Sequence, residues 1–148
     1  MVSELAPLIM SLRYIVTKGD MLIIEKPEAH LHPTMQVEIT RQIASLVKSG
    51  IQVLITTHSE WIIEELSNIV NKSRISSKIQ KKSSNDELVL NPEDVGVWLF
   101  VPKQRPKGTV VREVPLDYET GLYCDGFDEI AITLQNEWAD IADKIDAN

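Results

Sequence analysis

The segment MLIIEKPEAHLHP, residues 21–33, joins a short apolar run to residues that could act on a phosphate ester. Glu25 follows the run Met21–Ile24, and a carboxylate at the tip of a buried strand is costly unless it meets a cation. That cation is either Mg²⁺ at a bound triphosphate or a structural lysine or arginine. Lys26 comes next, where a second acid would activate water, and a protonated lysine cannot accept a proton.

A second residue with possible chemistry follows the next apolar run, Ile51–Thr57. His58 at its end can hydrogen-bond a γ-phosphate or the attacking water, or it can be a hydrogen-bonded core histidine. His30 and His32 lie two residues apart in the preceding turn, but with His58 they lack the ligand spacing of a structural zinc site. The spacing therefore argues against zinc.

These side chains need a scaffold that brings the ends of the two runs together. The two apolar runs, separated by one helix, predict a parallel βαβ unit whose first strand is buried on both faces. Pro33 suits the first turn of that helix, and Ser49-Gly50 suits its end. Ligands of parallel sheets bind at the carboxyl ends of the strands, so Glu25 and His58 are expected at the same edge.

Further helices are expected around this unit. Apolar residues at helical spacing predict a helix over 3–16, and Ser59 is a suitable N-cap for a third helix. Asp125 is suited to cap a last helix. The apolar stripe of that last helix consists of Phe127, Ile130, Leu134, Trp138, Ile141 and Ile145.

The remaining segments predict a polar connection and a strand pair. Residues 71–94 are rich in Ser and Lys, which indicates a loop, a helix extension or an insertion. Val95–Val101 and Thr109–Leu116 predict an antiparallel pair across a turn at 105–108. A further turn is expected at 119–121.

Composition limits the class of protein. A chain of 148 residues that is 43% hydrophobic and 25% charged can form one modest domain with a core. Its net charge of −7 argues against attraction of the whole surface to nucleic acid or anionic membranes. No apolar run approaches the roughly 18 residues of a membrane span, and MVSELAPL lacks the positive start of a signal peptide. Cys124 is the single cysteine, which favours a reducing cytoplasm.

Two motifs together resemble a known family. E-x-P-E-A-H-L-H-P after an apolar strand, followed by V-L-I-T-T-H-S-E, is similar to the ABC-type ATPase domain of OLD-like and RecF-like AAA proteins. The motifs cover Met21 to about Leu66, and Met1–Val16 resembles the helix after the family's signature motif. The resemblance implies an α/β, partial P-loop NTPase fold: a parallel βαβ core with packed helices, plus a small C-terminal β-hairpin and helix.

The resemblance also implies roles for single residues. Glu25 stands at the Walker B acid that supports Mg²⁺, and Lys26 stands where a catalytic glutamate normally polarises the attacking water. His58 matches the switch histidine that senses the γ-phosphate. The D-loop, which meets the partner subunit in an ATP-sandwich dimer, is matched by Ala29, His30, Leu31 and His32. ATP and Mg²⁺ are the implied cofactors.

The sequence departs from the family pattern in two ways. It has no GxxxxGK[ST], the motif whose backbone cradles the β- and γ-phosphates, and most of the signature motif is missing too. The chain is therefore expected to be a fragment, a truncated reading frame or half of a split ATPase, without bound nucleotide when isolated. Lys26 removes a general base, whose loss typically costs about 10²–10⁴-fold in rate. We expect no ATP hydrolysis by this chain alone.

These expectations define two hypotheses. The first is an ATP-binding fragment of an OLD-like ATPase, with 1–70 as the C-terminal half of the core, 71–94 as a polar linker or insertion, and 95–148 completing the same domain. The second is a non-catalytic dimerisation or regulatory module derived from that fold. The expected partner is a second copy or a P-loop-bearing N-terminal half, because a half-domain leaves sheet edges unpaired. DNA is a possible partner only in the context of the full-length family protein. No membrane partner is expected, and the expected location is the cytoplasm.

Overall fold

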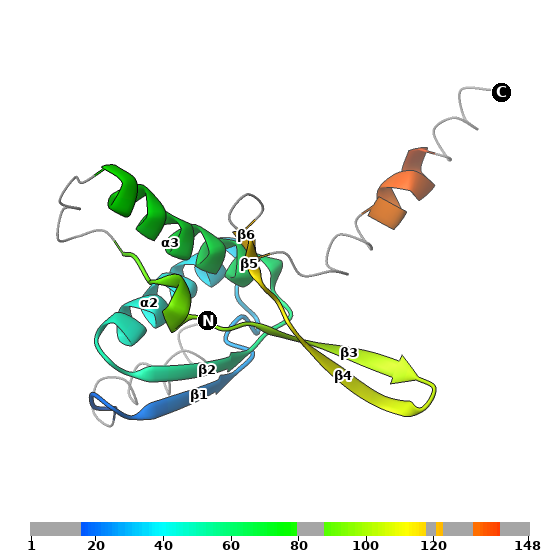
Figure 1. Cartoon of the computed structure of the whole chain (residues 1–148). Helices are drawn as coiled ribbons and strands as arrows, with labels where there is room; N and C mark the ends of the chain where they lie inside the picture. The colour runs from blue at the N-terminus through cyan, green and yellow to red at the C-terminus, as the bar shows by residue number, and fades with distance from the viewer. Residues whose placement is uncertain (1–15, 80–87, 118–120, 123–131, 140–148) are drawn as a thin grey trace. The chain divides into compact units, whose positions relative to one another are not determined.

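The chain folds into an α/β structure with two compact units. The computed structural model describes residues 16–79, 88–117, 121–122 and 132–139 (Figure 1). The first unit runs to Gly96 and includes Leu116–Leu122, and the second contains Val97–Pro115 and the residues from Tyr123 onward. The predictions of a helix over 3–16, of a cap at Asp125 and of most of the 119–121 turn lie outside the described residues.

A two-stranded parallel sheet lies at the centre of the first unit. Strand β1, Met21–Glu25, pairs in parallel with β2, Gln52–Thr56, and the register aligns Glu25 with Thr56. Helix α2, Pro33–Lys48, makes the connection between them (Figure 1). The predicted βαβ unit and the α/β fold class are confirmed, and this arrangement is consistent with a partial P-loop NTPase-like fold.

Helix α2 begins and ends where the sequence predicts. Pro33 occupies its first turn, and the imidazole Nδ1 of His32 accepts the backbone N–H of Thr34 at 3.4 Å as an N-cap. Ser49 is the C-cap, and Gly50 follows with φ of +92°, a left-handed conformation that glycine adopts without steric cost. The chain therefore turns directly from α2 into β2.

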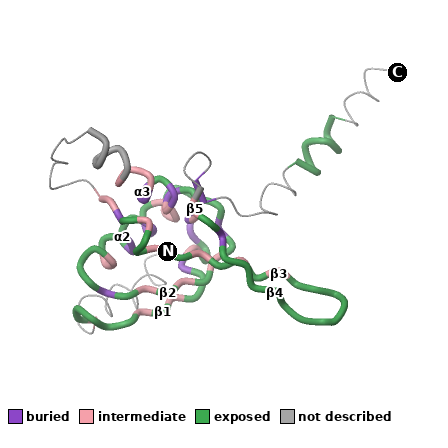
Figure 2. Tube along the Cα trace, viewed as in Figure 1, coloured by how far each residue is buried: buried purple, intermediate pink, exposed green. Residues whose placement is uncertain are grey.

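One face of the sheet packs against α2, and the other faces outward. Buried Ile39 and Ile43 of α2 meet Ile24, Val53 and Ile55 of the strands. The alternate residues point the opposite way, and their exposed fractions are 62% for Met21, 66% for Ile23 and 48% for Leu54 (Figure 2). The prediction that the first strand is buried on both faces is wrong, because no described element covers this second face.

Helix α3, Glu60–Ile79, packs beside α2 (Figure 1). The hydroxyl of Ser59 accepts the backbone N–H of Ile62 at 3.3 Å, which confirms the predicted N-cap. Helix α3 continues through 71–79, so of the three interpretations of the segment after residue 70, the helix extension is the one observed there. Their shared core consists of Ala44, Ile69, Val70 and Leu90.

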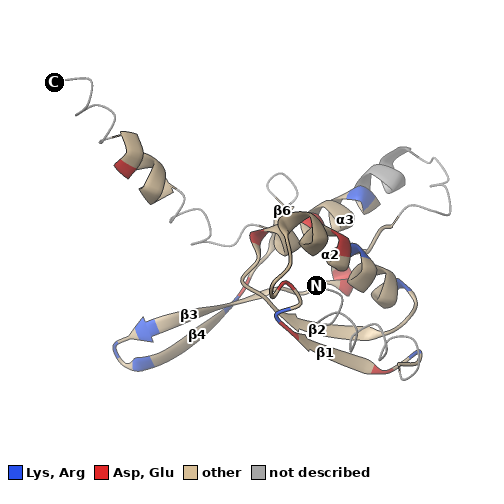
Figure 3. Cartoon of the chain, turned by 180° about the vertical axis from the view of Figure 1, so that it is seen from behind, with Lys and Arg blue, Asp and Glu red and all other residues tan. Residues whose placement is uncertain are grey.

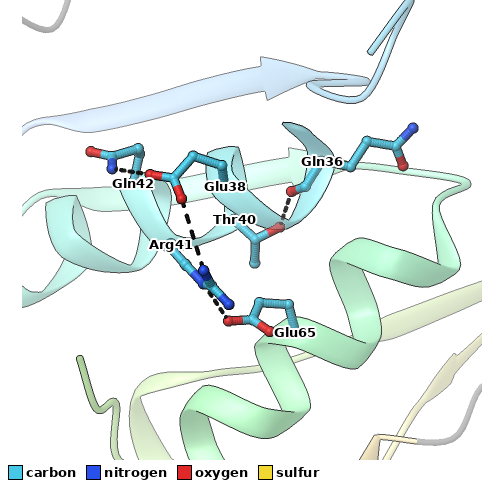
Figure 4. Close-up of polar contacts among 6 residues, drawn as sticks. All are labelled: Gln36, Glu38, Thr40, Arg41, Gln42 and Glu65. Atoms are coloured by element: carbon cyan, nitrogen blue, oxygen red, sulfur yellow. Dashed lines mark hydrogen bonds and ion pairs between the residues drawn. The ribbon is translucent and has the colours of Figure 1, made fainter. Parts of the chain in front are cut away.

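An ion pair joins the two helices on their polar side. Arg41 Nε of α2 donates to Glu65 Oε1 of α3 at 2.8 Å, and the Glu65 side chain is 10% exposed (Figure 4). Hydrogen bonding to Glu65 and its negative charge raise the pKa of Arg41. A nearly buried carboxylate needs such a partner, because its desolvation is otherwise uncompensated. The pair therefore helps to fix how α3, and with it the segment before α3, is placed.

Two short strands complete the first unit. Strand β5, Leu116–Asp117, pairs with β6, Gly121–Leu122. The same unit also contains a 3-10 turn at Pro92–Asp94. The backbone N–H of Leu122 donates to Ser67 Oγ of α3 at 3.0 Å. Gly121 has φ of +78°, and a Cβ there would fall on Ser67 Oγ, so glycine allows β6 to lie this close to α3.

The second unit contains a β-hairpin and a short helix. Strands β3, Trp98–Gln104, and β4, Lys107–Glu113, pair antiparallel, as predicted, but the turn is Arg105-Pro106. Lys107 and Gly108 pair with the opposite strand, so the four-residue turn expected at 105–108 is wrong in length. Residues 132–139 are helical. No helix among the described residues is long and apolar enough to cross a membrane.

Candidate functional site

The carboxyl ends of β1 and β2 place Glu25 and His58 at one edge of the sheet, as predicted. Glu25 is aligned with Thr56, and His58 follows two residues beyond. The ladder continues one step past the strands, since the backbone N–H of Lys26 donates to Thr56 O at 2.8 Å. Both Glu25 and His58 are exposed, so each side chain is accessible to a ligand.

Glu28 connects the turn after β1 to His58. Its Oε1 accepts the backbone N–H of His58 at 2.8 Å, across 30 residues of sequence. Its other oxygen, Oε2, is buried and has no hydrogen-bond partner among the described residues. A buried acceptor without a donor costs about 1–3 kcal/mol, so this oxygen is open to a donor at the edge of the sheet.

Gln36 of α2 links the turn after β1 to the turn after β2. Its Nε2 donates to Leu31 O at 2.8 Å, and its Oε1 accepts the hydroxyl of Ser59 at 2.5 Å. Ser59 N in turn donates to Thr57 Oγ1 at 2.9 Å. The turn after β1 and the turn after β2 are therefore cross-linked by side chains as well as by the sheet, and His58 lies between these links in the sequence.

Lys26 turns away from the strand with φ of 49°, a left-handed conformation uncommon for a residue with a Cβ. Its side chain is exposed and forms no ion pair with any described residue. Glu28, two residues further on, forms no ion pair with Lys26, and its Oε1 accepts the backbone N–H of His58 instead. Lys26 is thus a free cation beside the end of β1 within the described structure.

The four residues predicted to form a D-loop differ in their exposure. Leu31 is buried in the core between α2 and the sheet, so its side chain is not available to a partner. Ala29 and His30 are exposed in the turn, and His30 has φ of 62°. His32 is exposed, while its imidazole caps α2. A partner meeting this segment would therefore contact Ala29, His30 and His32.

The donor set at this edge can hold Mg²⁺ in part. Mg²⁺ is usually bound by one or two carboxylates together with phosphate oxygens and water, and Glu25 offers one exposed carboxylate. In the described part of the chain, no three His, Cys, Asp or Glu residues gather closely enough to hold a metal ion. Glu25 therefore fits a Mg²⁺ whose other ligands come from nucleotide phosphate and water.

Glu28 and Gln36 contribute to the site but were not predicted from the sequence. Each acts on a residue far along the chain, Glu28 on His58 and Gln36 on Ser59, and neither contact follows from local periodicity. One signal was present for Glu28: a second acid inside the turn that follows an apolar strand, on the side where the neighbouring strand also ends. No comparable signal marks Gln36, which lies on a helix among other polar residues.

The region that contains the candidate site matches a known protein family. Residues 2–63 match the family model described as the AAA ATPase domain. The match covers less than half of the 148 residues, and it contains Glu25, Glu28 and His58. No curated protein and no solved structure matched the chain. Residues 2–63 are therefore similar to an AAA-type ATPase domain, whose members use nucleotide and Mg²⁺ in general.

Proposed function

We propose that this chain carries the Walker B and switch-histidine part of an ATP·Mg²⁺ site of the OLD-like, ABC-type kind. The observation that supports the proposal most directly is the parallel pairing of β1 and β2, which aligns Glu25 with Thr56 and puts His58 at the same sheet edge. The match of residues 2–63 to the AAA ATPase domain agrees with it. Ligands of parallel sheets bind at this end of the strands.

In this proposal each residue has one task. The carboxylate of Glu25 would hold Mg²⁺, directly or through water, and a bound Mg²⁺ would offset the negative charge of the phosphates. His58 contacts the γ-phosphate through its imidazole, and Glu28 holds the His58 backbone in place. Lys26 stands where the base would act, and its cation favours phosphate binding without activating water.

The proposal requires a phosphate cradle from outside this sequence. The 148 residues contain no GxxxxGK[ST], so the backbone N–H groups that hold the β- and γ-phosphates must come from a partner or from a P-loop-bearing N-terminal half. Ala29, His30 and His32 form the exposed part of the turn beside the site, where the partner subunit of an ATP-sandwich dimer would bind.

We expect no steady ATP turnover by the isolated chain, and at best weak nucleotide affinity. The reason is the combined lack of the phosphate cradle and of a base at position 26. Phosphate release at saturating ATP and Mg²⁺ measures turnover, and the variant Glu25→Gln separates intrinsic hydrolysis from a contaminant. Steady release that Glu25→Gln abolishes would refute the proposal of an inactive half-site.

A second candidate function is a non-catalytic dimerisation or regulatory module. One apolar face of the β1–β2 sheet, with Met21, Ile23 and Leu54, has no cover among the described residues. This favours the second candidate, because exposed apolar patches commonly mark interaction surfaces.

The second candidate predicts that the chain self-associates whether or not ATP is present. Light scattering should then give a mass above 16.7 kDa that rises with concentration, and Ile23→Ser should lower it. The exposed Gln52→Ser on the same face is the matched control. A monomer mass over the whole concentration range would contradict self-association, and association that needs ATP would favour the nucleotide-site proposal.

A further inference from the structure

The hairpin of the second unit has an apolar face with nothing on it among the described residues. Strands β3 and β4 pair with each other alone, and every residue of Pro102–Glu113 is exposed. Phe100 and Val111 are directly opposite each other, and Trp98 lies two residues before Phe100, so the three side chains share one face. Their exposed fractions are 66%, 52% and 54%, respectively. We call this set the aromatic face.

A hairpin of two strands is marginally stable in water by itself, so the aromatic face needs a cover. The hairpin is also basic in a chain of net charge −7. Residues 97–115 contain one acid, Glu113, against four bases: Lys103, Arg105, Lys107 and Arg112. The register places Lys107 on the aromatic face and Arg105 in the turn beside it, whereas Lys103 and Arg112 are on the opposite face. Figure 3 shows basic residues at the end of the hairpin, and no ion pair to a described acid involves them. The cover should therefore be apolar where it meets the aromatic face and acidic along the flank that comes near Arg105 and Lys107.

The C-terminal segment of the chain has both properties. In the helix of residues 132–139, Leu134 and Trp138 are four residues apart and so share a face, with exposed fractions of 59% and 73%. The sequence continues this stripe on both sides, with Phe127, Ile130, Ile141 and Ile145. The single base of residues 123–148 is Lys144, and the acids are Asp125, Asp128, Glu129, Glu137, Asp140, Asp143 and Asp146.

The helix of residues 132–139 also needs a packing partner for its apolar stripe. Isolated helices shorter than about 12–15 residues are marginal in water, and packing of an apolar stripe supplies most helical stability in proteins. All of residues 132–139 are exposed, so the described structure gives the stripe no partner.

The chain is long enough to supply its own cover. The residues 123–131 join β6 to the helix, and β6 pairs with β5, which follows the hairpin after two residues. An extended chain spans about 3.3 Å per residue, so this connection reaches about 30 Å, whereas a seven-residue strand is about 23 Å long. Tethering also gives the segment a high effective concentration near the hairpin.

We propose that the C-terminal helix, residues 132–139, packs on the aromatic face of the same chain's hairpin. Leu134 and Trp138 meet Trp98, Phe100 and Val111, while the acids that flank the apolar stripe lie near Arg105 of the turn and Lys107 of the aromatic face. Aromatic pairs across such a contact add to the burial of apolar area. A polyanion such as nucleic acid is the weaker occupant, because the acidic segment of the same unit would repel it.

A paramagnetic label tests this placement in the full chain. The nitroxide is attached to Asn136→Cys, on the side of the helix away from Leu134 and Trp138, in a chain carrying Cys124→Ser. The backbone amide signals of Phe100 and Val111 should broaden strongly when label and ¹⁵N are in the same molecule. Broadening that occurs only when labelled and ¹⁵N chains are different molecules would overturn the proposal in favour of a second copy, and a lack of broadening would overturn it outright.

Two sets of variants show whether the contact is the proposed one. Trp138→Ala should lose most of the broadening, and the exposed Gln135→Ala, off the stripe, should keep it. Because Trp138→Ala could also unfold the helix, the hairpin pair Arg105→Glu with Lys107→Glu provides an independent change, and it should reduce the broadening severalfold. If both variants broaden as the parent does, neither the apolar nor the charged contact exists and the proposal fails.

Discussion

Replacing Lys26 with glutamate should raise ATP turnover by about 10²–10⁴-fold once a P-loop-bearing partner completes the site. The backbone of residue 26 is held by the hydrogen bond from its N–H to Thr56 O. Its φ of 49° is already adopted by lysine, a residue with a Cβ, so glutamate can adopt it as well. The substitution therefore changes the end of the side chain and not the turn. A carboxylate at this position can accept the proton of the attacking water, which the ammonium group cannot.

The same substitution should lower nucleotide affinity or leave it level, since a cation near the phosphates is replaced by an anion. Lys26→Gln is the matched control, because it removes the charge without adding a base. Turnover by phosphate release and affinity by titration of the reconstituted complex are measured for all three chains. If Lys26→Glu and Lys26→Gln turn over ATP equally, position 26 is not the base position and the motif alignment is wrong.

Replacing Ile69 with alanine should lower the free energy of unfolding by about 2–5 kcal/mol. Ile69 is 1% exposed in α3 and packs with Ala44 of α2, Val70 and Leu90, so the lost methyl groups leave a cavity between the helices. Whole domains are stable by about 5–15 kcal/mol, which makes this a large fraction of the total.

Urea unfolding followed by circular dichroism measures the effect, and the midpoint should fall by about 1 M or more. Asn68→Ala is the control, because Asn68 is the exposed neighbour on the same helix and surface changes of this kind stay within about 0.5 kcal/mol. Equal midpoints for the two variants would show that the core shared by α2 and α3 does not hold the first unit together.

The parts of the fold that depend on local chemistry were predictable from the sequence. Pro33 at the start of α2, Ser49-Gly50 at its end and Ser59 before α3 are found as expected, because caps are decided within a few residues. The pairing of β1 with β2 followed from two apolar runs joined by one helix. The common edge of Glu25 and His58 followed in turn, since parallel strands end on the same side.

The features that depend on distant contacts were not predictable. Ile23 and Leu54 are as apolar as their partly buried neighbours, so composition alone could not tell that their face is uncovered in the described structure. The helix α3 continues into a Ser- and Lys-rich stretch whose residue types also suit a loop. In the candidate site, Glu28 was overlooked because its partner, the backbone of His58, is 30 residues away.

The hydrogen bond between Glu28 and His58 also makes the two turns thermodynamically linked. In the proposed dimer, a subunit that binds the turn containing Ala29 and His30 would also restrain Glu28, and through Glu28 the backbone of His58. If a nucleotide draws His58 out of its present position, that bond lengthens and the turn loses one of its restraints. Linkage is reciprocal, so whatever factor the nucleotide imposes on the partner's affinity, the partner imposes on the nucleotide's.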